Sequence, residues 1–288
     1  MLSKGRRRRP PLPLGGRGAK RGGCNPESSL AEQGRGGCNP AAQPDRARRP
    51  AASTVWLFDL DDTLHDATGA AFGEMHQAIG DYVVRHLGIT PEEADALRRR
   101  YWLRYGATML GLVRHHGIRA AHFLEETHRM PGLEARLRAS APDRAALSRL
   151  PGRKYIVTNA PRAYAMRVLD TLDLTRRFDG VITIEDMTMF GMPRPKPDAR
   201  MFRRLVARLG VPATRCILVE DTLQHLKSAR SLGMYTVWMQ RWLGGSRTGL
   251  LHREKSRAAT GKNERRRGHK PAYVCARISS LRKLAPAQ

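Results

Sequence analysis

Short apolar runs alternate with helical stretches over residues 54–243 of this 288-residue chain. The short runs are continuously apolar, as strands buried on both faces are. We predict strands at Thr54–Phe58, Lys154–Thr158, Gly180–Ile184, Cys216–Glu220 and Thr236–Met239. Helical spacing of apolar residues predicts helices at Arg162–Leu172, Ala199–Leu209 and Leu223–Leu232. This alternation is typical of an α/β fold with a parallel sheet.

The interval 68–145 interrupts the alternation. It follows the first predicted strand directly and contains no strand-like run. Its apolar residues, such as Phe72, Met75 and Ile79, fall at helical spacing, and Pro91 stands where a helix can begin. An insert of this kind predicts a helical cap domain over the strand ends, which would exclude water and add substrate contacts.

The formal net charge of +26 is concentrated near the two ends of the chain. Residues 1–53 hold 12 Lys and Arg against 3 Asp and Glu, and residues 246–288 hold 12 against 2. Residues 1–53 are rich in Gly, Pro and Arg and repeat Arg-Gly-Gly-Cys-Asn-Pro at 21–26 and 35–40. We therefore predict a disordered basic tail at 1–53 and a second basic tail at 246–288. The predicted core comprises 54–67 and 146–245.

Several classes of protein are disfavoured by the sequence. The sequence contains no apolar run of 18 residues, so we expect no membrane span. Residues 1–20 lack the apolar stretch of a signal peptide. The 4 Cys show neither metal-ligand spacing nor a disulfide framework. A cytoplasmic protein fits these features best. The tails could bind nucleic acid or another anionic surface, but they lack aromatics interleaved with the arginines. The sequence carries no signal of oligomeric state.

Carboxylates follow two of the predicted strands. Asp59 and Asp61 come after Val55–Phe58, and Glu220 and Asp221 close the run that begins at Cys216. Ligands in open α/β sheets bind just past the carboxyl ends of the strands. Carboxylates gathered there need a cation, a shared proton or donors, and Mg²⁺ prefers oxygen ligands of this type.

Polar side chains follow two other predicted strands. Thr158 and Asn159 end the second one, where a hydroxyl and an amide could bind phosphoryl oxygens. Lys196 lies in the loop Pro193-Arg-Pro-Lys-Pro-Asp198, which three prolines stiffen, immediately before a predicted helix. Each of these segments is also ordinary turn chemistry when taken alone.

Together, in this order, the four segments resemble the four motifs of the haloacid dehalogenase superfamily. The first motif matches Asp59, Asp61 and Thr63, the second Thr158, the third Lys196, and the fourth the pair Glu220-Asp221. His225 departs from the pattern, since relatives often have Asn there. The resemblance covers about residues 54–243 and implies a Rossmann-like core with a helical cap after the first strand.

The resemblance also implies a mechanism. Asp59 would attack phosphorus and form an aspartyl-phosphate, while Asp61 would protonate the leaving oxygen and then activate water. Mg²⁺ would be held by Asp59, the backbone carbonyl of Asp61 and Asp221, with Glu220 close by or binding the ion through water. The phosphoryl oxygens would be bound by Thr158, Asn159 and Lys196. The presence of Asp61 argues against dehalogenation, in which no leaving alkoxide needs a proton.

Further segments resemble the pyrimidine 5′-nucleotidase branch of this superfamily. They are Tyr101-Trp-Leu-Arg-Tyr105-Gly-Ala-Thr-Met-Leu-Gly111-Leu, Thr158-Asn-Ala160, Phe178-Asp-Gly180 and the stretch from Glu185 to Asp198. This branch implies hydrolysis of UMP- or CMP-like nucleotides. Tyr101 and Tyr105 would then contact the base or sugar. Their i, i+4 spacing equally predicts that they pack in the cap's own core.

Three other functions fit parts of the sequence. A broad phosphatase would act on sugar phosphates or pyridoxal phosphate. A phosphosugar mutase would share the four carboxylates but would release no net phosphate. A nucleic-acid-binding protein would use the basic tails and would not need the filled catalytic positions.

Overall fold

The computed structural model describes residues 54–242 and 270–284, all within the unit Arg48–Gln288. The predicted tail at 1–53, with its repeats at 21–26 and 35–40, lies outside the described residues, as does most of the predicted tail at 246–288. No helix in the described part of the chain is long and apolar enough to cross a membrane.

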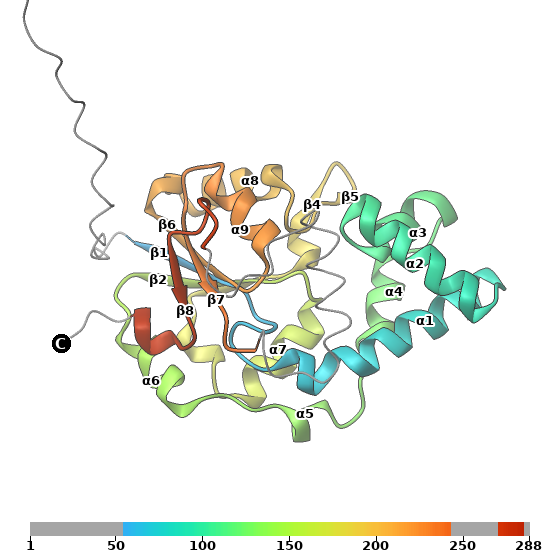
Figure 1. The fold of residues 1–288 in the computed structure, drawn as a ribbon, viewed down its shortest axis with the longest axis horizontal. Coiled ribbons are helices and arrows are strands. Elements are labelled where there is room, and N and C mark those ends of the chain that lie inside the picture. The colour runs from blue at the N-terminus through green and yellow to red at the C-terminus, as the bar shows by residue number, and fades with distance from the viewer. Residues whose placement is uncertain (1–53, 243–269, 285–288) are drawn as a thin grey trace, which may run out of the picture. The chain divides into compact units, whose positions relative to one another are not determined.

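Six parallel strands form one sheet in the order β3-β2-β1-β6-β7-β8 (Figure 1). Their bounds are β1 Val55–Phe58, β2 Arg153–Val157, β3 Gly180–Ile182, β6 Cys216–Glu220, β7 Tyr235–Met239 and β8 Ala276–Ile278. The α/β fold with a parallel sheet, predicted from the sequence, is confirmed. Because β1 lies between β2 and β6, the residues that follow these three strands meet at one edge of the sheet.

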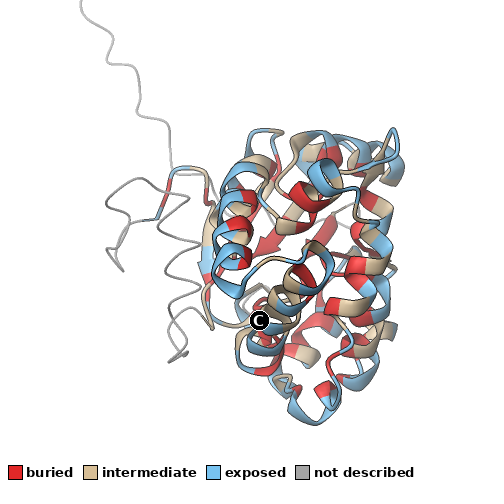
Figure 2. Ribbon diagram, turned by 90° about the vertical axis from the view of Figure 1, so that its right-hand side faces the viewer, coloured by how far each residue is buried: buried red, intermediate tan, exposed pale blue. Residues whose placement is uncertain are grey.

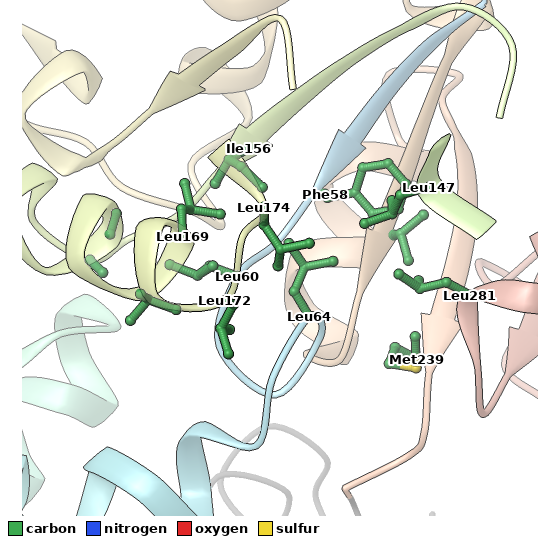
Figure 3. Close-up of a cluster of buried hydrophobic side chains, with 14 of the residues drawn as sticks. Phe58, Leu60, Leu64, Leu147, Ile156, Leu169, Leu172, Leu174, Met239 and Leu281 are labelled. Carbon is green, nitrogen blue, oxygen red and sulfur yellow. The ribbon is translucent and has the colours of Figure 1, made fainter. Parts of the chain in front are cut away.

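Helices cover both faces of the sheet. The alternation along β1 sends Phe58 into one apolar cluster with Leu147 and Leu169, and sends Leu57 into another with Phe202. Figure 3 shows the first cluster, in which Phe58 lies near Leu147. The covering helices are α6 Ala141–Arg149, α7 Arg162–Thr171, α8 Ala199–Leu209 and α9 Leu223–Arg230.

A helical cap is inserted after β1 and has an apolar cluster of its own. The helices between β1 and α6 are the π-helix η1 Thr68–Phe72, α1 Gly73–Leu87, α2 Pro91–Tyr105, α3 Thr108–His116, α4 Ala120–Thr127 and α5 Leu133–Arg136. α2 begins with a capping box between Thr90 and Glu93 and ends at Gly106 in the left-handed conformation. In Figure 2 the inward-facing residues of the helices are buried and the outward-facing ones are exposed.

The cap's own cluster is shorter than the predicted interval 68–145. It runs from Tyr82 to Leu124 along the chain and also contains Ile184 from the core. Met130, Leu133 and Leu137 pack instead against the cluster that covers the sheet. The residues after α4 therefore belong to the core by their packing. The sequence does not reveal this, because one helical pattern continues across the boundary.

The prediction that the folded core ends at 245 is wrong for residues 270–284. β8 pairs in parallel with β7, with Val237 opposite Ala276, and extends the sheet by one strand. Ile278 and Leu281 are buried in the core cluster. The strand has only three residues and lies among basic residues, so the sequence pattern does not distinguish it from a basic tail.

Asp143 of α6 holds this C-terminal segment in place. Its carboxylate accepts hydrogen bonds from Ser280 Oγ at 2.5 Å and from the backbone N–H of Leu281 at 3.0 Å, and it pairs with Arg241. We expect Asp143→Ala to lower the free energy of unfolding by about 2 kcal/mol, because buried donors lose a charged acceptor. Urea unfolding measures this change. The control Glu125→Ala breaks an exposed pair with Arg129 and should change little; equal losses in both variants would contradict the role of Asp143.

The remaining short elements lie mostly between β3 and β6. They are the 3₁₀ helices η2 Thr175–Arg177, η3 Ile184–Met187, η4 Ala213–Arg215 and η5 Leu281–Leu284, with the antiparallel pair β4 Thr188–Met189 and β5 Met192–Pro193. The β4–β5 hairpin leads directly into the loop that carries Lys196. Because β3 runs parallel to β2 in the same sheet, the chain that leads to this loop leaves the sheet at the edge where β1, β2 and β6 also end.

Candidate active site

Three carboxylates meet where β1 and β6 end. Asp59 continues the pairing of the two strands, since its N–H donates to Val219 O at 3.0 Å. This register places Asp59 beside Glu220, and Asp221 follows. Oxygen atoms of the three side chains lie within 4.8 Å of one another, and all three residues are buried. Of the predicted metal ligands, the structure brings together the side chains of Asp59, Glu220 and Asp221.

Lys196 enters this group from the loop before α8. Its Nζ donates to Asp59 Oδ1 at 2.6 Å and to Glu220 Oε2 at 2.8 Å, and the side chain is buried. Asn159 holds the loop in place, because its Oδ1 accepts from Lys196 N and its Nδ2 donates to Lys196 O, each at 2.9 Å. Asn159, predicted to bind phosphoryl oxygens, thus has both ends of its amide engaged with the backbone of Lys196.

The electrostatics of this group favour a bound cation. Burial raises the pKa of Asp59 to about 8, with help from the negative charge of Glu220 and against the pull of Lys196. Burial also disfavours ionised Glu220, but Lys196 and His225 outweigh it and hold the pKa of Glu220 well below its usual range. Lys196 pairs with two of the three buried carboxylates and His225 with one of them, so an oxygen-binding divalent ion still fits the donor set.

The side chain of Asp61 is not part of this carboxylate group and has partners of its own. Its Oδ1 accepts from Tyr164 OH at 2.7 Å and lies 3.1 Å from His65 Nε2. Sequence reasoning missed both partners. Tyr164 stands on α7 at core spacing, and the sequence carries no sign that its hydroxyl reaches the first motif. His65 could have been found from its i, i+4 relation to Asp61.

Two threonines lie at the ends of β1 and its neighbour β2. Thr158 follows β2, is buried, and accepts from Ala160 N at 3.0 Å. Among the described residues no acceptor takes its hydroxyl proton. Thr63 donates to Asp59 Oδ2 at 3.3 Å.

His225 and Asp62 support the loops of the site. His225 Nδ1 lies 3.0 Å from Glu220 Oε2, so the residue that departs from the family pattern contacts the fourth motif directly. Asp62 has a left-handed backbone, with φ of 55°, and accepts from both the N–H and the hydroxyl of Thr68. This contact ties the first motif to the start of the cap segment.

The predicted substrate contacts Tyr101 and Tyr105 both belong to the cap's apolar cluster. The Tyr101 hydroxyl pairs with His116 Nε2 at 2.7 Å, and its ring abuts Gly111, where a Cβ would lie 2.1 Å from Tyr101 Cγ. The Tyr105 hydroxyl pairs with His115 Nε2 at 2.6 Å. The structure thus favours the packing interpretation of these tyrosines.

Residues 54–233 match the haloacid dehalogenase-like hydrolase family. The chain belongs to this family. The relatives of this hydrolase include proteins named for phosphate metabolism and proteins named as dehalogenases. It is 25% identical over 210 residues to phosphate metabolism protein 8 of Saccharomyces cerevisiae (strain ATCC 204508 / S288c), covering 66% of this chain and 61%, less than two thirds, of the yeast protein.

Another relative carries a dehalogenase name. This hydrolase is 26% identical over 206 residues to an (S)-2-haloacid dehalogenase of Pseudomonas fluorescens, covering 65% of this chain and 85% of that protein. Among solved structures, the HAD phosphatase from Thermococcus onnurineus aligns with a TM-score of 0.48 and 22% identity, covering 81% of this chain and 96% of that chain. The family match over residues 54–233 is what assigns the chain to the hydrolases.

Proposed function

We propose that this hydrolase is a Mg²⁺-dependent phosphomonoesterase, and within that class a pyrimidine 5′-nucleotidase. The observation that carries the phosphatase proposal is Asp61, a second carboxylate two residues after Asp59 that two side chains hold in place. Hydrolysis of a phosphomonoester expels an alkoxide that needs a proton, whereas displacement of a halide does not. The nucleotide preference is supported by the resemblance of the cap and third-motif segments.

In the proposed reaction the carboxylate of Asp59 attacks phosphorus, and the bond from phosphorus to the ester oxygen breaks. Asp61 gives its proton to the leaving oxygen. Asp61 then takes a proton from a water molecule, which attacks the aspartyl-phosphate and releases phosphate and the free Asp59 carboxylate. The hydroxyl of Thr158 and the ammonium of Lys196 bind the phosphoryl oxygens and stabilise their charge.

Asp59, Glu220 and Asp221, with the backbone carbonyl of Asp61, would hold Mg²⁺. When bound, the ion supplies positive charge that lets the ionised nucleophile and the phosphate dianion approach each other. The fit rests on the three buried carboxylates, of which Lys196 pairs with Asp59 and Glu220 and His225 with Glu220.

Phosphate release from a panel of monoesters tests the proposal. The full chain should release phosphate from UMP and CMP faster than from glycerol phosphate, sugar phosphates or pyridoxal phosphate, and EDTA should abolish release. Equal rates on all monoesters would support the phosphatase and overturn the nucleotidase assignment. Halide release from 2-chloropropionate without phosphate release, or isomerised sugar phosphate without net release, would overturn the phosphatase.

A further inference from the structure

Two hydrogen-bond donors converge on one oxygen of Asp61. Tyr164 OH donates to Oδ1 at 2.7 Å, and His65 Nε2 lies 3.1 Å from the same atom. The donors come from different parts of the fold, since Tyr164 stands on α7 and His65 on the loop after β1. They therefore hold the carboxylate from two directions.

The other oxygen of Asp61 is left for the reaction. Among residues 54–242 and 270–284 no side chain or backbone donor bonds to Oδ2. Turning the plane of the carboxylate away from this position would lose both hydrogen bonds at once, and bonds to a charged acceptor are the stronger kind. The pair of donors thus selects one orientation of the carboxylate.

The burial of His65 is costly unless it serves Asp61. The residue is 0% exposed, and its Nδ1 has no hydrogen-bond partner among the described residues. Its polar side-chain contact is with Asp61 alone, which assigns the proton to Nε2. A leucine would fill the same space without burying an unpaired nitrogen. Packing therefore does not account for a histidine here.

Tyr164 is also held in place. Its side chain is buried, and the ring of His128, at the end of α4, packs edge-on against it with a centroid distance of 5.8 Å. His128 is itself anchored through Nδ1, 3.0 Å from Leu124 O. The hydroxyl of Tyr164 is thus directed to Asp61 by a packed ring rather than by a mobile side chain.

We propose that Tyr164 and His65 are positioning residues that orient the Asp61 carboxylate so that Oδ2 faces the leaving oxygen. This inference rests on the proposed function, in which Asp61 carries the proton. Neither residue touches the reacting phosphate in the proposal, and both act through Asp61. A correctly oriented proton donor matters most when the leaving group is strongly basic.

The test compares leaving groups of rising basicity, from p-nitrophenyl phosphate through phenyl phosphate to alkyl phosphates. We expect Tyr164→Phe and His65→Leu to lower kcat/KM by about 10- to 100-fold on alkyl phosphates and several-fold less on p-nitrophenyl phosphate, since proton donation contributes about 10²–10⁴-fold. His65→Gln keeps an N–H donor and should recover part of the loss. The control Tyr155→Phe removes a hydroxyl from a half-buried tyrosine of β2 and should leave kcat/KM unchanged for every leaving group.

The outcomes separate the two proposals. A steeper dependence on leaving-group basicity in both variants, with partial recovery in His65→Gln, supports the positioning role. Uniform losses across the series, or none, in variants of an active wild type overturn it and leave the phosphatase standing. Absence of phosphate release by the wild type on every monoester overturns the proposed function and this inference with it.

Discussion

Asp59→Asn is expected to lower phosphate release by at least about 10³-fold while the protein stays folded, because an amide cannot serve as the attacking carboxylate. The substitution keeps the size of the side chain and the backbone bond to Val219. Steady-state phosphate release measures the loss of turnover, and circular dichroism shows whether the protein stays folded. The control Asp81→Asn changes an exposed aspartate on α1 that bonds to Gln77 and should retain full activity.

The same variant should gain stability when metal is absent. The pKa of Asp59 is raised from 3.8 to about 8, so the folded protein binds a proton more tightly there than the unfolded chain does. This contribution to stability is fully present below pH 3.8 and is lost as the pH rises through 8. In EDTA, the Tm of Asp59→Asn relative to wild type should therefore rise from pH 5 to pH 8. A constant difference between the two proteins would contradict the burial argument.

Lys196→Met is expected to destabilise the protein by about 3–5 kcal/mol in the absence of metal and to abolish turnover. The ammonium bonds to Asp59 and Glu220 at the same time, and all three side chains are buried. Its removal leaves two buried carboxylates with only His225 beside Glu220 to offset their charge, and it also removes the cation that binds the phosphoryl group in the proposed reaction. Urea unfolding and phosphate release measure these effects.

Two further variants separate charge from packing in this group. Lys227→Met changes an exposed lysine of α9 and should cost little in either measurement. The double variant Lys196→Met/Glu220→Gln removes one of the two carboxylate charges that Lys196 offsets. It should be more stable than Lys196→Met alone but should remain inactive. If the second substitution lowers stability further, repulsion between the carboxylates is not the cause of the loss.

The candidate site could be predicted from sequence wherever its residues follow strands. Continuous apolar runs identify buried parallel strands, and the ends of neighbouring strands must meet at one edge of the sheet. That reasoning brought together Asp59, Thr158, Glu220 and Asp221. Lys196 came from its family motif, because nothing in a proline-rich loop alone shows that its ammonium is buried.

Other contacts could not be predicted because they depend on how helices and loops pack. Tyr164 lies 103 residues from Asp61 in sequence and has the spacing of a core residue. Asn159 has the chemistry of a phosphate ligand, but the backbone of Lys196 takes up its amide. β8 depends on pairing with β7 and on the contact of Asp143 with the segment after it, and neither is visible in three residues of sequence.

The central claim is that Asp59 becomes phosphorylated during turnover, and mass spectrometry after acid quenching tests it most directly. The full chain is mixed with Mg²⁺ and a phosphomonoester that it hydrolyses, quenched within milliseconds, and digested. We predict that the peptide containing Asp59 carries the mass of one phosphoryl group, and that Asp59→Asn lacks it under the same conditions. Rapid phosphate release by the wild type, with that peptide unmodified at every quench time, would contradict the account.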